Sequence, residues 1–340
     1  MVYDIIKVGN KIRGTDLMKS FVANKNDEGL RLDKYIKKVL IHAPDSLIYK
    51  YIRKKRIKVN KKKEDISYKL KQGDIIEFYV NYELFLGEEE KEDSFLKIKP
   101  DLDIIYEDQN VMIIHKKSGV IVHSDEKENF NTLIAHIQAY LYKKGEYDFK
   151  NENSFAPSLC NRLDRNTGGI IIATKNAEAL RCMNEIIKER QLHKKYLCVA
   201  LGHFDKWEAT LNAYHFKDEK NKEVYISKDK KNGYKSITTK YRVLKEIKSK
   251  GEILSFLEVD LITGRTHQIR AHMAYISHPL LGDGKYGRNE VNKKFKIKYQ
   301  CLYSYKLDFD IKNENSYLYY LNKKHFEIKN VDFGINDNER

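Results

Sequence analysis

Two polar motifs contain most of the residues that could do chemistry in this chain. Residues 161–169 read Asn-Arg-Leu-Asp-Arg-Asn-Thr-Gly-Gly and place the carboxylate of Asp164 between arginines. Residues 263–270 read Thr-Gly-Arg-Thr-His-Gln-Ile-Arg, and His272 and the pair Gly282-Asp283 follow. Arginines can keep a carboxylate ionised and aimed through charge-assisted hydrogen bonds, and an ionised carboxylate can act as a nucleophile. The two motifs together predict an active site built on a single aspartate.

The tripeptide Arg-Leu-Asp occurs twice, and only the second copy is placed like a catalytic group. The first copy, residues 31–33, opens a helix-periodic stretch that runs to Leu40, so we expect its charges on a helix surface. Asp164 instead precedes a glycine pair and the apolar run 170–173, a pattern typical of a buried strand entered from a tight loop. Loops beside a rigid sheet often carry catalytic residues. The alternative is a salt bridge of Asp164 that only pins the loop.

The motifs are predicted to lie in a large domain of strands and helices. From Leu102 onward, short apolar runs alternate with polar segments, and a helix stripe that begins at Asn176 lies between them. Many strands with a few interposed helices indicate an α+β fold. At 340 residues the chain is long enough for one such core and a small additional domain.

The additional domain is predicted at residues 28–84, as two helices followed by a strand. The first helix covers residues 32–40, the second begins near Ser46, and the strand covers residues 75–80. No acidic residue occurs from Lys50 to Lys63. This basic run predicts contacts with nucleic-acid phosphates, and the alternative is a solvated helix face. The residues expected to make these contacts are Lys50, Arg53, Lys54, Lys55, Arg56 and Lys58.

Residues 85–100 are predicted to be a linker, because their charge turns abruptly acidic and they lack hydrophobic periodicity. The expected segments are an N-terminal extension at 1–27, the basic domain at 28–84, the linker at 85–100, the large domain at 101–330 and a C-terminal tail at 331–340.

The composition favours a nucleic-acid partner. The formal net charge is +15, which suits a polyanion, although a merely lysine-rich protein has the same balance. The four cysteines form no Cys-x-x-Cys pair, which indicates reduced thiols in the cytoplasm rather than a zinc knuckle or a disulfide framework. No apolar run reaches the length of a membrane span, so we expect a cytoplasmic protein without a membrane anchor.

The two motifs resemble the signature of the RluA-type pseudouridine synthases, including the RluC-like and RluD-like members. The matching residues are Arg162, Leu163, Asp164, Thr167, Gly169, Gly264 to Arg270, His272, Pro279, Gly282 and Asp283. The chain departs from the signature at Asn161 (His in the family), Gly168 (Ser), Lys117 (Pro), His115 (Asn) and the pair Tyr303-Ser304 (His-Ala). The basic domain is similar to an S4 RNA-binding domain.

The resemblance implies a mixed, mainly antiparallel sheet with a central RNA-binding cleft, and the conversion of uridine to pseudouridine. It implies three catalytic residues, with Asp164 as nucleophile, Arg265 as its ion-pairing arginine and Tyr196 stacking on the uracil. The residues implied in substrate binding are Arg162, Leu261, Lys195, Thr266, His267, Gln268 and Arg270. Neither a metal nor an organic cofactor is implied, because the isomerisation is redox-neutral.

Several of these residues could instead have a purely structural role. An isolated strand tyrosine such as Tyr196 is more often part of a core, and Thr266 and Gln268 could cap a helix. His267 and His272 could be ordinary surface or core histidines.

The expected partner is RNA, most of all large-subunit (23S) ribosomal RNA or an assembly intermediate, with transfer RNA as the alternative substrate. No obligate protein partner is implied. The competing class is a non-catalytic RNA-binding or ribosome-assembly factor on the same fold. A DNA-binding regulator would need a major-groove recognition helix, and no such helix can be recognised in the sequence.

Overall fold

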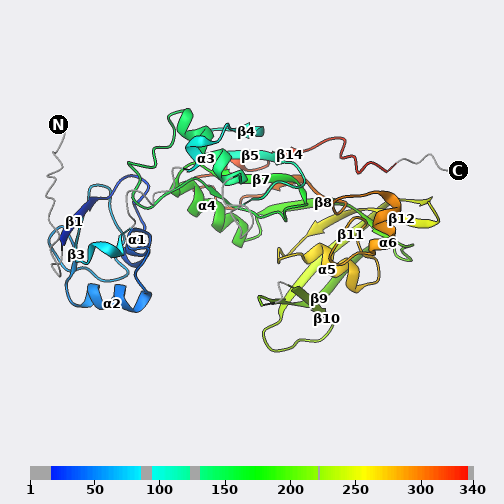
Figure 1. The fold of residues 1–340 in the computed structure, drawn as a ribbon, viewed down its shortest axis with the longest axis horizontal. Helices are drawn as coiled ribbons and strands as arrows, with labels where there is room; N and C mark the ends of the chain where they lie inside the picture. The colour runs from blue at the N-terminus through cyan, green and yellow to red at the C-terminus, as the bar shows by residue number, and fades with distance from the viewer. Residues whose placement is uncertain (1–16, 86–93, 123–130, 221–222, 336–340) are drawn as a thin grey trace. The chain divides into compact units, whose positions relative to one another are not determined.

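The computed structural model describes residues 17–85, 94–122, 131–220 and 223–335. The chain forms two compact units (Figure 1). The N-terminal unit comprises Met1–Ser94 and Gly145–Ala156, and the large unit comprises Phe95–Lys144 and Pro157–Arg340. Most of the predicted N-terminal extension, half of the predicted linker and part of the predicted tail, namely residues 1–16, 86–93 and 336–340, lie outside the described residues.

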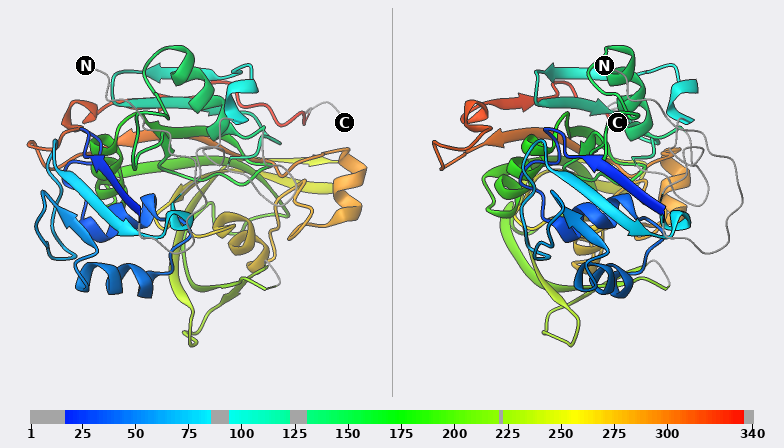
Figure 2. Two further views of the ribbon diagram at one scale, coloured as in Figure 1. Left: turned by 60° about the vertical axis from the view of Figure 1, so that its left-hand side comes forward. Right: turned by 90° about the vertical axis from the view of Figure 1, so that its left-hand side faces the viewer.

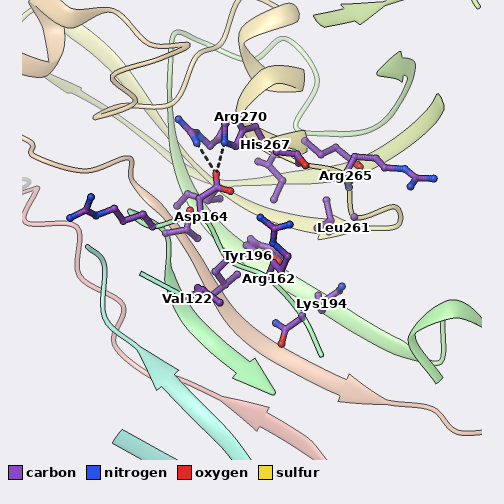
Figure 3. A pocket seen from close by; sticks show the side chains of 18 of the residues that line it. Val122, Arg162, Asp164, Lys194, Tyr196, Leu261, Arg265, His267 and Arg270 are labelled. Carbon is purple, nitrogen blue, oxygen red and sulfur yellow. Dashed lines mark hydrogen bonds and ion pairs between the residues drawn. The ribbon is translucent and has the colours of Figure 1, made fainter. Parts of the chain in front are cut away.

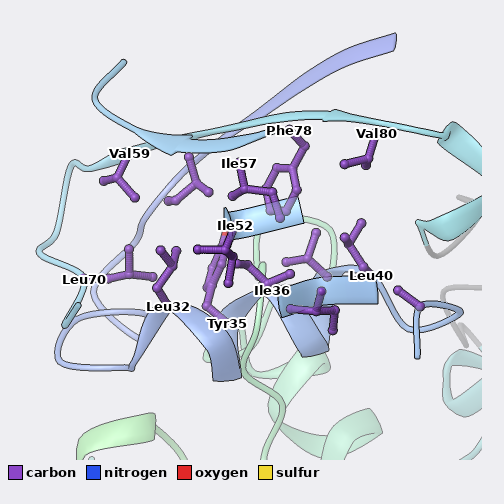
Figure 4. Close-up of a cluster of buried hydrophobic side chains, with 14 of the residues drawn as sticks. Leu32, Tyr35, Ile36, Leu40, Ile52, Ile57, Val59, Leu70, Phe78 and Val80 are labelled. Atoms are coloured by element: carbon purple, nitrogen blue, oxygen red, sulfur yellow. The ribbon is translucent and has the colours of Figure 1, made fainter. Parts of the chain in front are cut away.

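The N-terminal unit packs two helices against a three-stranded antiparallel sheet of order β1-β3-β2. Its elements are β1 (Leu17–Val22), α1 (Leu32–Val39), α2 (Asp45–Arg53), β2 (Ile57–Val59), β3 (Ile75–Val80) and a short 3-10 helix η1 (Tyr82–Leu84). Leu32, Tyr35 and Ile36 recur on one face of α1, and they share a buried cluster with Phe78 of β3 (Figure 4). The two predicted helices and the predicted strand are confirmed.

The sequence-based start at residue 28 leaves out β1. This strand pairs with β3 along its whole length, from Leu17 opposite Val80 to Val22 opposite Ile75. Met18 and Val22 are 56% and 60% exposed at the edge of the sheet, so the segment lacks the alternation that identifies a half-buried strand.

Residues 145–156 also belong to the N-terminal unit, whereas the sequence analysis assigned them to the large domain. Asp27 is fully buried, and its carboxylate accepts hydrogen bonds from Asn24 N at 2.9 Å, from Asn153 Nδ2 at 2.8 Å and from Ser154 Oγ. Polar contacts between residues so far apart in the chain leave no local pattern, so the sequence alone could not reveal them.

In the described part of the chain, the large unit is organised on one sheet of eleven strands. The strand order is β10-β9-β11-β12-β8-β13-β7-β5-β4, with β14 beside β13 and β6 beside β7. All of these pairs are antiparallel except β13 with β7, so the predicted α+β fold with a mixed, mainly antiparallel sheet is confirmed.

The strands of this sheet are β4 (Asp103–Glu107), β5 (Val111–Lys116), β6 (Ser158–Leu159), β7 (Gly168–Thr174), β8 (Leu192–Leu201), β9 (Glu208–Asp218), β10 (Glu223–Ser227), β11 (Lys235–Ser249), β12 (Glu252–Leu261), β13 (Leu302–Phe309) and β14 (His325–Glu327). The helices of the large unit are η2 (Ser94–Lys97), whose first residue closes the N-terminal unit, α3 (Leu133–Lys143), α4 (Ala177–Lys188), α5 (Gln268–Tyr275), α6 (Asn289–Phe295) and η3 (Tyr319–Leu321). The sheet twists strongly, so β9 and β11 run across the direction of β5 and β7 (Figure 2).

Helix α4 anchors the strand that follows the first motif. Met183 and Ile186 of α4 share a buried cluster with Ile170 of β7, and every residue of β7 is buried. The side chain of Asn176 caps the helix by accepting a hydrogen bond from Ala179 N at 2.8 Å, as the sequence predicted. The strand after Asp164 is therefore held on a rigid layer. None of the helices in the described residues has the length and apolar character needed to cross a lipid bilayer.

Candidate active site

The two motifs face one cavity in the large unit (Figure 3). The cavity has a volume of about 670 Å³, within the range of about 300–1,000 Å³ that ligand sites usually have. Residues 160–167 line one part of it, residues 261 and 264–270 line another, and Lys194 and Tyr196 of β8 contribute from the sheet. Two segments that are far apart in sequence thus meet at one site, as the motifs predicted.

Hydrogen bonds to β7 fix the loop that carries Asp164. Asn161 Oδ1 accepts from Ile172 N at 2.7 Å, and Asn161 Nδ2 donates to Ile170 O at 3.2 Å. Further along the loop, Thr167 N donates to the carbonyl of Asp164 at 3.0 Å. Asn161 is one of the departures from the family signature, and here its amide side chain hydrogen-bonds the backbone of β7.

A buried ammonium holds the same loop from behind. Lys116 is 1% exposed, and its Nζ donates to the carbonyl oxygens of Lys117, Val120 and Arg165 at 3.1, 3.0 and 2.9 Å. Burial lowers the pKa of Lys116 to about 8, while the charge of Asp164 acts to raise it. Lys116 was not predicted to belong to the site, although it lies at the end of an apolar strand and between two departures from the family signature, His115 and Lys117.

Arg270 holds the carboxylate of Asp164. Its Nη1 donates to Asp164 Oδ2 at 2.7 Å, while its Nε and Nη2 donate to Asp283 Oδ2 and Oδ1 at 2.7 and 2.9 Å. Asp283 is fully buried, and it also accepts from the backbone N–H groups of Lys285 and Tyr286 at 2.9 and 3.0 Å. Burial acts to raise the pKa of Asp283, but these donors hold it below its usual range.

The ion pair with Asp164 is therefore made by Arg270, and not by Arg265 as the family resemblance implied. Arg265 precedes α5 and is exposed, whereas Arg270 lies in the first turn of the helix, where its side chain faces the cavity. In the described residues no ion pair of the Arg265 guanidinium is found, and its backbone N–H donates to Gln268 Oε1 at 3.1 Å. Arg265 still lines the cavity and carries a charge there.

Tyr196 lies on the floor of the cavity, between the strands that flank β8. It is 5% exposed, and it pairs across the sheet with Val259 of β12 and Ser304 of β13. Burial raises the pKa of Tyr196 to about 12, and the charge of Asp164 adds to this, so the phenol is protonated at neutral pH. The hydroxyl of Ser304 lies beside this ring. Among the described residues, no group forms a hydrogen bond with this hydroxyl.

Lys194, and not the predicted Lys195, lines the cavity. Successive side chains of a strand point to opposite faces, so Lys194 shares its face with Tyr196 while Lys195 points away. Nζ of Lys195 lies 3.3 Å from Glu258 Oε1 on β12. Lys194 was not predicted from the sequence, although its spacing of two residues from Tyr196 places it on the same face of the strand.

The start of α5 differs from the helix cap predicted at Thr266. The residue before the helix is His267, which has φ 52° in the left-handed region and makes no side-chain cap. Its Nδ1 lies 2.9 Å from the Tyr286 hydroxyl, and its Nε2 lies 3.8 Å from Asp164 Oδ2. Burial lowers the pKa of His267, although the Asp164 charge acts in the other direction. A neutral imidazole therefore lies beside the carboxylate at neutral pH.

The side chains of Gln268 and His272 are buried and form hydrogen bonds within the protein. Gln268 is buried, accepts from Thr263 Oγ1 at 2.9 Å and donates to Thr238 O at 3.1 Å, so it ties the second motif to β11. His272 is 1% exposed, its Nδ1 lies 3.0 Å from Thr239 Oγ1, and burial lowers its pKa to about 4. For His272 this geometry fits an ordinary core histidine, whereas Gln268 does not cap α5 and also lines the cavity.

The predicted RNA-contacting residues lie at the end of α2 and in the segment through β2, within the N-terminal unit. Lys50, Arg53, Lys54 and Lys55 are exposed. Arg56 and Lys58 are partly buried, and both contact Tyr79: Arg56 Nη1 donates to the Tyr79 carbonyl at 3.4 Å, and Lys58 Nζ lies 5.0 Å from the ring centroid.

Comparison with known proteins finds relatives for both units of the chain. Residues 110–275 match the family described as RNA pseudouridylate synthase, and residues 30–76 match the S4 domain. An uncharacterized RNA pseudouridine synthase of Mycoplasma capricolum is 33% identical over 322 residues, which cover 93% of this chain and 99% of that protein. The ribosomal large subunit pseudouridine synthase C of Vibrio cholerae is 31% identical over 262 residues, which cover 76% of this chain and 77% of that protein.

A solved structure shares the fold. Human RNA Pseudouridylate Synthase Domain Containing 1 is 20% identical, with a TM-score of 0.50 over 69% of this chain and 94% of that chain.

Proposed function

This chain belongs to the RNA pseudouridine synthase family, and we propose that it converts specific uridines of structured RNA into pseudouridine, with large-subunit (23S) ribosomal RNA as its substrate. The Vibrio cholerae relative and a Borreliella burgdorferi relative, 34% identical over 63% of this chain, are named ribosomal large subunit pseudouridine synthases. The S4 match adds an RNA-binding domain. The proposed place of action is the cytoplasm.

The observation that carries the proposal is the carboxylate of Asp164, held in the cavity by Arg270. The isomerisation breaks the bond between N1 of uracil and C1′ of the ribose, turns the base and forms a bond from C5 to C1′. It neither adds nor removes electrons overall, so a nucleophile and a path for one proton are sufficient. Arg270 occupies Oδ2 of Asp164, and in the described structure Oδ1 has no hydrogen-bond partner. Asp164 can therefore present Oδ1 to the target nucleotide as the nucleophile.

Three further residues suit a flipped uridine. Extruding a base from folded RNA costs a few kcal/mol, and side chains that stack on the base or fill the gap offset this cost. Tyr196 lines the cavity, so its ring can stack on the uracil, and its protonated hydroxyl can take part in moving the proton from C5. Leu261 lines the cavity as an apolar wall, and Arg162 lines it as an exposed cation that can enter the gap in the stack.

The test is a pseudouridine map of ribosomal and transfer RNA from cells that lack this protein. The strain is complemented with the wild-type chain or with Asp164→Asn, which keeps the size of the side chain and removes its charge. We expect defined sites in large-subunit RNA to vanish in the deletion strain and to return only with the wild-type chain.

Two results would contradict the proposal. Sites that are lost from transfer RNA alone would refute the ribosomal substrate. An unchanged map, together with rescue of any growth or assembly defect by Asp164→Asn, would indicate a non-catalytic RNA-binding factor. Binding of the same RNA by purified Asp164→Asn is the matched control, because it shows that the substitution removes chemistry and not affinity.

A further inference from the structure

Lys194 brings a positive charge into the cavity that no carboxylate of the described residues balances. Its side chain is partly buried, and Nζ lies 3.8 Å from the position that a Cβ at Gly264 would take. Among the described residues, Nζ has neither a hydrogen bond nor an ion pair, and burial alone lowers the pKa of Lys194. An ammonium that is partly removed from water without a partner is unfavourable, so an anionic ligand at this position would recover the lost interaction.

The neighbouring lysine shows that this is not simply an effect of a lysine-rich sequence. Lys195 is the adjacent residue on the same strand, but it points to the other face of β8. There, Glu258 lies 3.3 Å away and is also bound by Arg242 Nη2 at 3.0 Å. The outer lysine thus has an ion-pair partner within the protein, whereas among the described residues the inner one has none.

The position of Lys194 indicates which part of the RNA it meets. In Figure 3, Lys194 lies below Arg162 and Tyr196, and Asp164 lies above them. Asp164 does not perturb the pKa of Lys194, which agrees with a separation between the two side chains. Because Asp164 must face the target nucleotide, Lys194 faces RNA next to that nucleotide. The anion that every RNA strand offers there is a phosphate, which lysine binds as a point charge.

We propose that Lys194 binds a backbone phosphate of the RNA strand next to the target uridine. This inference rests on the proposed function and adds a residue that directs the strand into the cavity.

The experiment measures RNA binding by the full chain over a series of salt concentrations. The variants are Lys194→Met, which keeps the apolar stem and removes the charge, and Lys194→Arg, which keeps the charge. Lys195→Met is the matched control on the opposite face. We expect Lys194→Met to bind roughly ten- to hundredfold more weakly at low salt. The slope of log K against log salt should fall by about 0.7–0.9, the contribution of one phosphate contact.

Lys194→Arg should restore the slope, and Lys195→Met should bind as the wild type does. A second test uses RNA in which uncharged methylphosphonates replace the phosphates that flank the uridine. Wild type and Lys194→Met should bind this RNA equally well. A wild-type slope for Lys194→Met, or an equal loss for Lys195→Met, would overturn the inference. So would a slower reaction of Lys194→Met with an unchanged slope, which would indicate contact with the base.

The outcome can be separated from that of the proposed function. If the wild-type chain forms no pseudouridine, the proposed reaction fails, and the salt series still decides whether Lys194 contacts phosphate. If the wild type is active and Lys194→Met has its full affinity and slope, only the inference about Lys194 fails.

Discussion

At the scale of single residues, Arg270 joins two aspartates that have different tasks. Its planar guanidinium presents a fork of donors to Asp283 and still has one N–H group for Asp164. The guanidinium carbon also lies 5.3 Å from the centroid of the Tyr286 ring. A lysine could not make these contacts at once, because it has a single nitrogen. The buried Asp283 therefore fixes Arg270, and Arg270 fixes the carboxylate of Asp164, the proposed nucleophile.

The two arginines of the second motif are expected to behave differently when each is replaced by methionine. Arg270→Met leaves the fully buried Asp283 without its cation, so we expect the free energy of unfolding to fall by about 3–5 kcal/mol and pseudouridine formation to be lost. Arg265→Met removes an exposed charge, so its free energy of unfolding should stay within about 0.5 kcal/mol of the wild type. Urea unfolding of both variants measures the difference. Equal destabilisation by the two substitutions would contradict the ion-pair assignment.

The sequence identified the residues of this site better than it identified their partners. Asp164 could be found because a carboxylate stands before glycines and a buried strand. The choice between Arg265 and Arg270 depends on where α5 begins, and the residue before it, His267, has a left-handed backbone that no periodicity reveals. The choice between Lys194 and Lys195 depends on the face of β8 that meets the cavity. Tertiary packing determines which of these side chains faces the cavity, so the sequence alone does not identify it.

At the scale of elements, three departures from the family signature meet where β5, β7 and β13 lie side by side. Gly168 of β7 stands opposite Tyr303 of β13, and a Cβ at Gly168 would lie 2.4 Å from Tyr303 Cε2. The Tyr303 hydroxyl is hydrogen-bonded to His115 Nε2 on β5, and His115 Nδ1 lies 2.7 Å from Asp103 Oδ2. The tyrosine therefore occupies the space that a serine at position 168 would need, so the departures compensate one another.

This compensation predicts a coupling between positions 168 and 303. Gly168→Ser should lower the free energy of unfolding by about 1–3 kcal/mol, because the added atoms overlap the Tyr303 ring. In the Tyr303→His background the same substitution should cost less, with a coupling energy of about 0.5–3 kcal/mol in a double-mutant cycle. Urea unfolding of the wild type, both single variants and the double variant gives this energy.

Gly284→Ser is the control for adding a side chain to a glycine. Gly284 is exposed, and nothing lies within 4 Å of the position of its Cβ, so the expected change is within about 0.5 kcal/mol. Strictly additive effects at positions 168 and 303 would refute the compensation.

At the scale of the whole molecule, the two units carry separate parts of the proposed task. Every described residue that lines the cavity belongs to the large unit, whereas the exposed basic residues near α2 belong to the N-terminal unit. The polar contacts of Asp27 with residues 153 and 154 make a later stretch of the chain part of the N-terminal unit. A fragment that ends at residue 85 would lack these contacts, so the division of labour is best tested in the full chain.

The test replaces the basic side chains that the fold does not use. Arg53, Lys54 and Lys55 are exposed, whereas Arg56 and Lys58 contact Tyr79 and are left unchanged. Lys55 has φ 59°, a left-handed conformation that asparagine tolerates, so the variant is Arg53→Gln, Lys54→Gln and Lys55→Asn. Each phosphate contact that is lost should reduce the slope of log K against log salt by about 0.7–0.9.

Binding and chemistry should separate in this variant. Affinity should fall most relative to the wild type at low salt, where each phosphate contact contributes most. The single-turnover rate at saturating RNA should stay at the wild-type value, because the arrangement of Asp164 and Arg270 does not involve these side chains. Lys194→Met is the matched comparison from inside the cavity, since it is expected to reduce the slope by a single contact. A slower single-turnover rate in the triple variant at saturating RNA would mean that the N-terminal unit also contributes to the chemical step. Binding and catalysis would then not be divided between the two units.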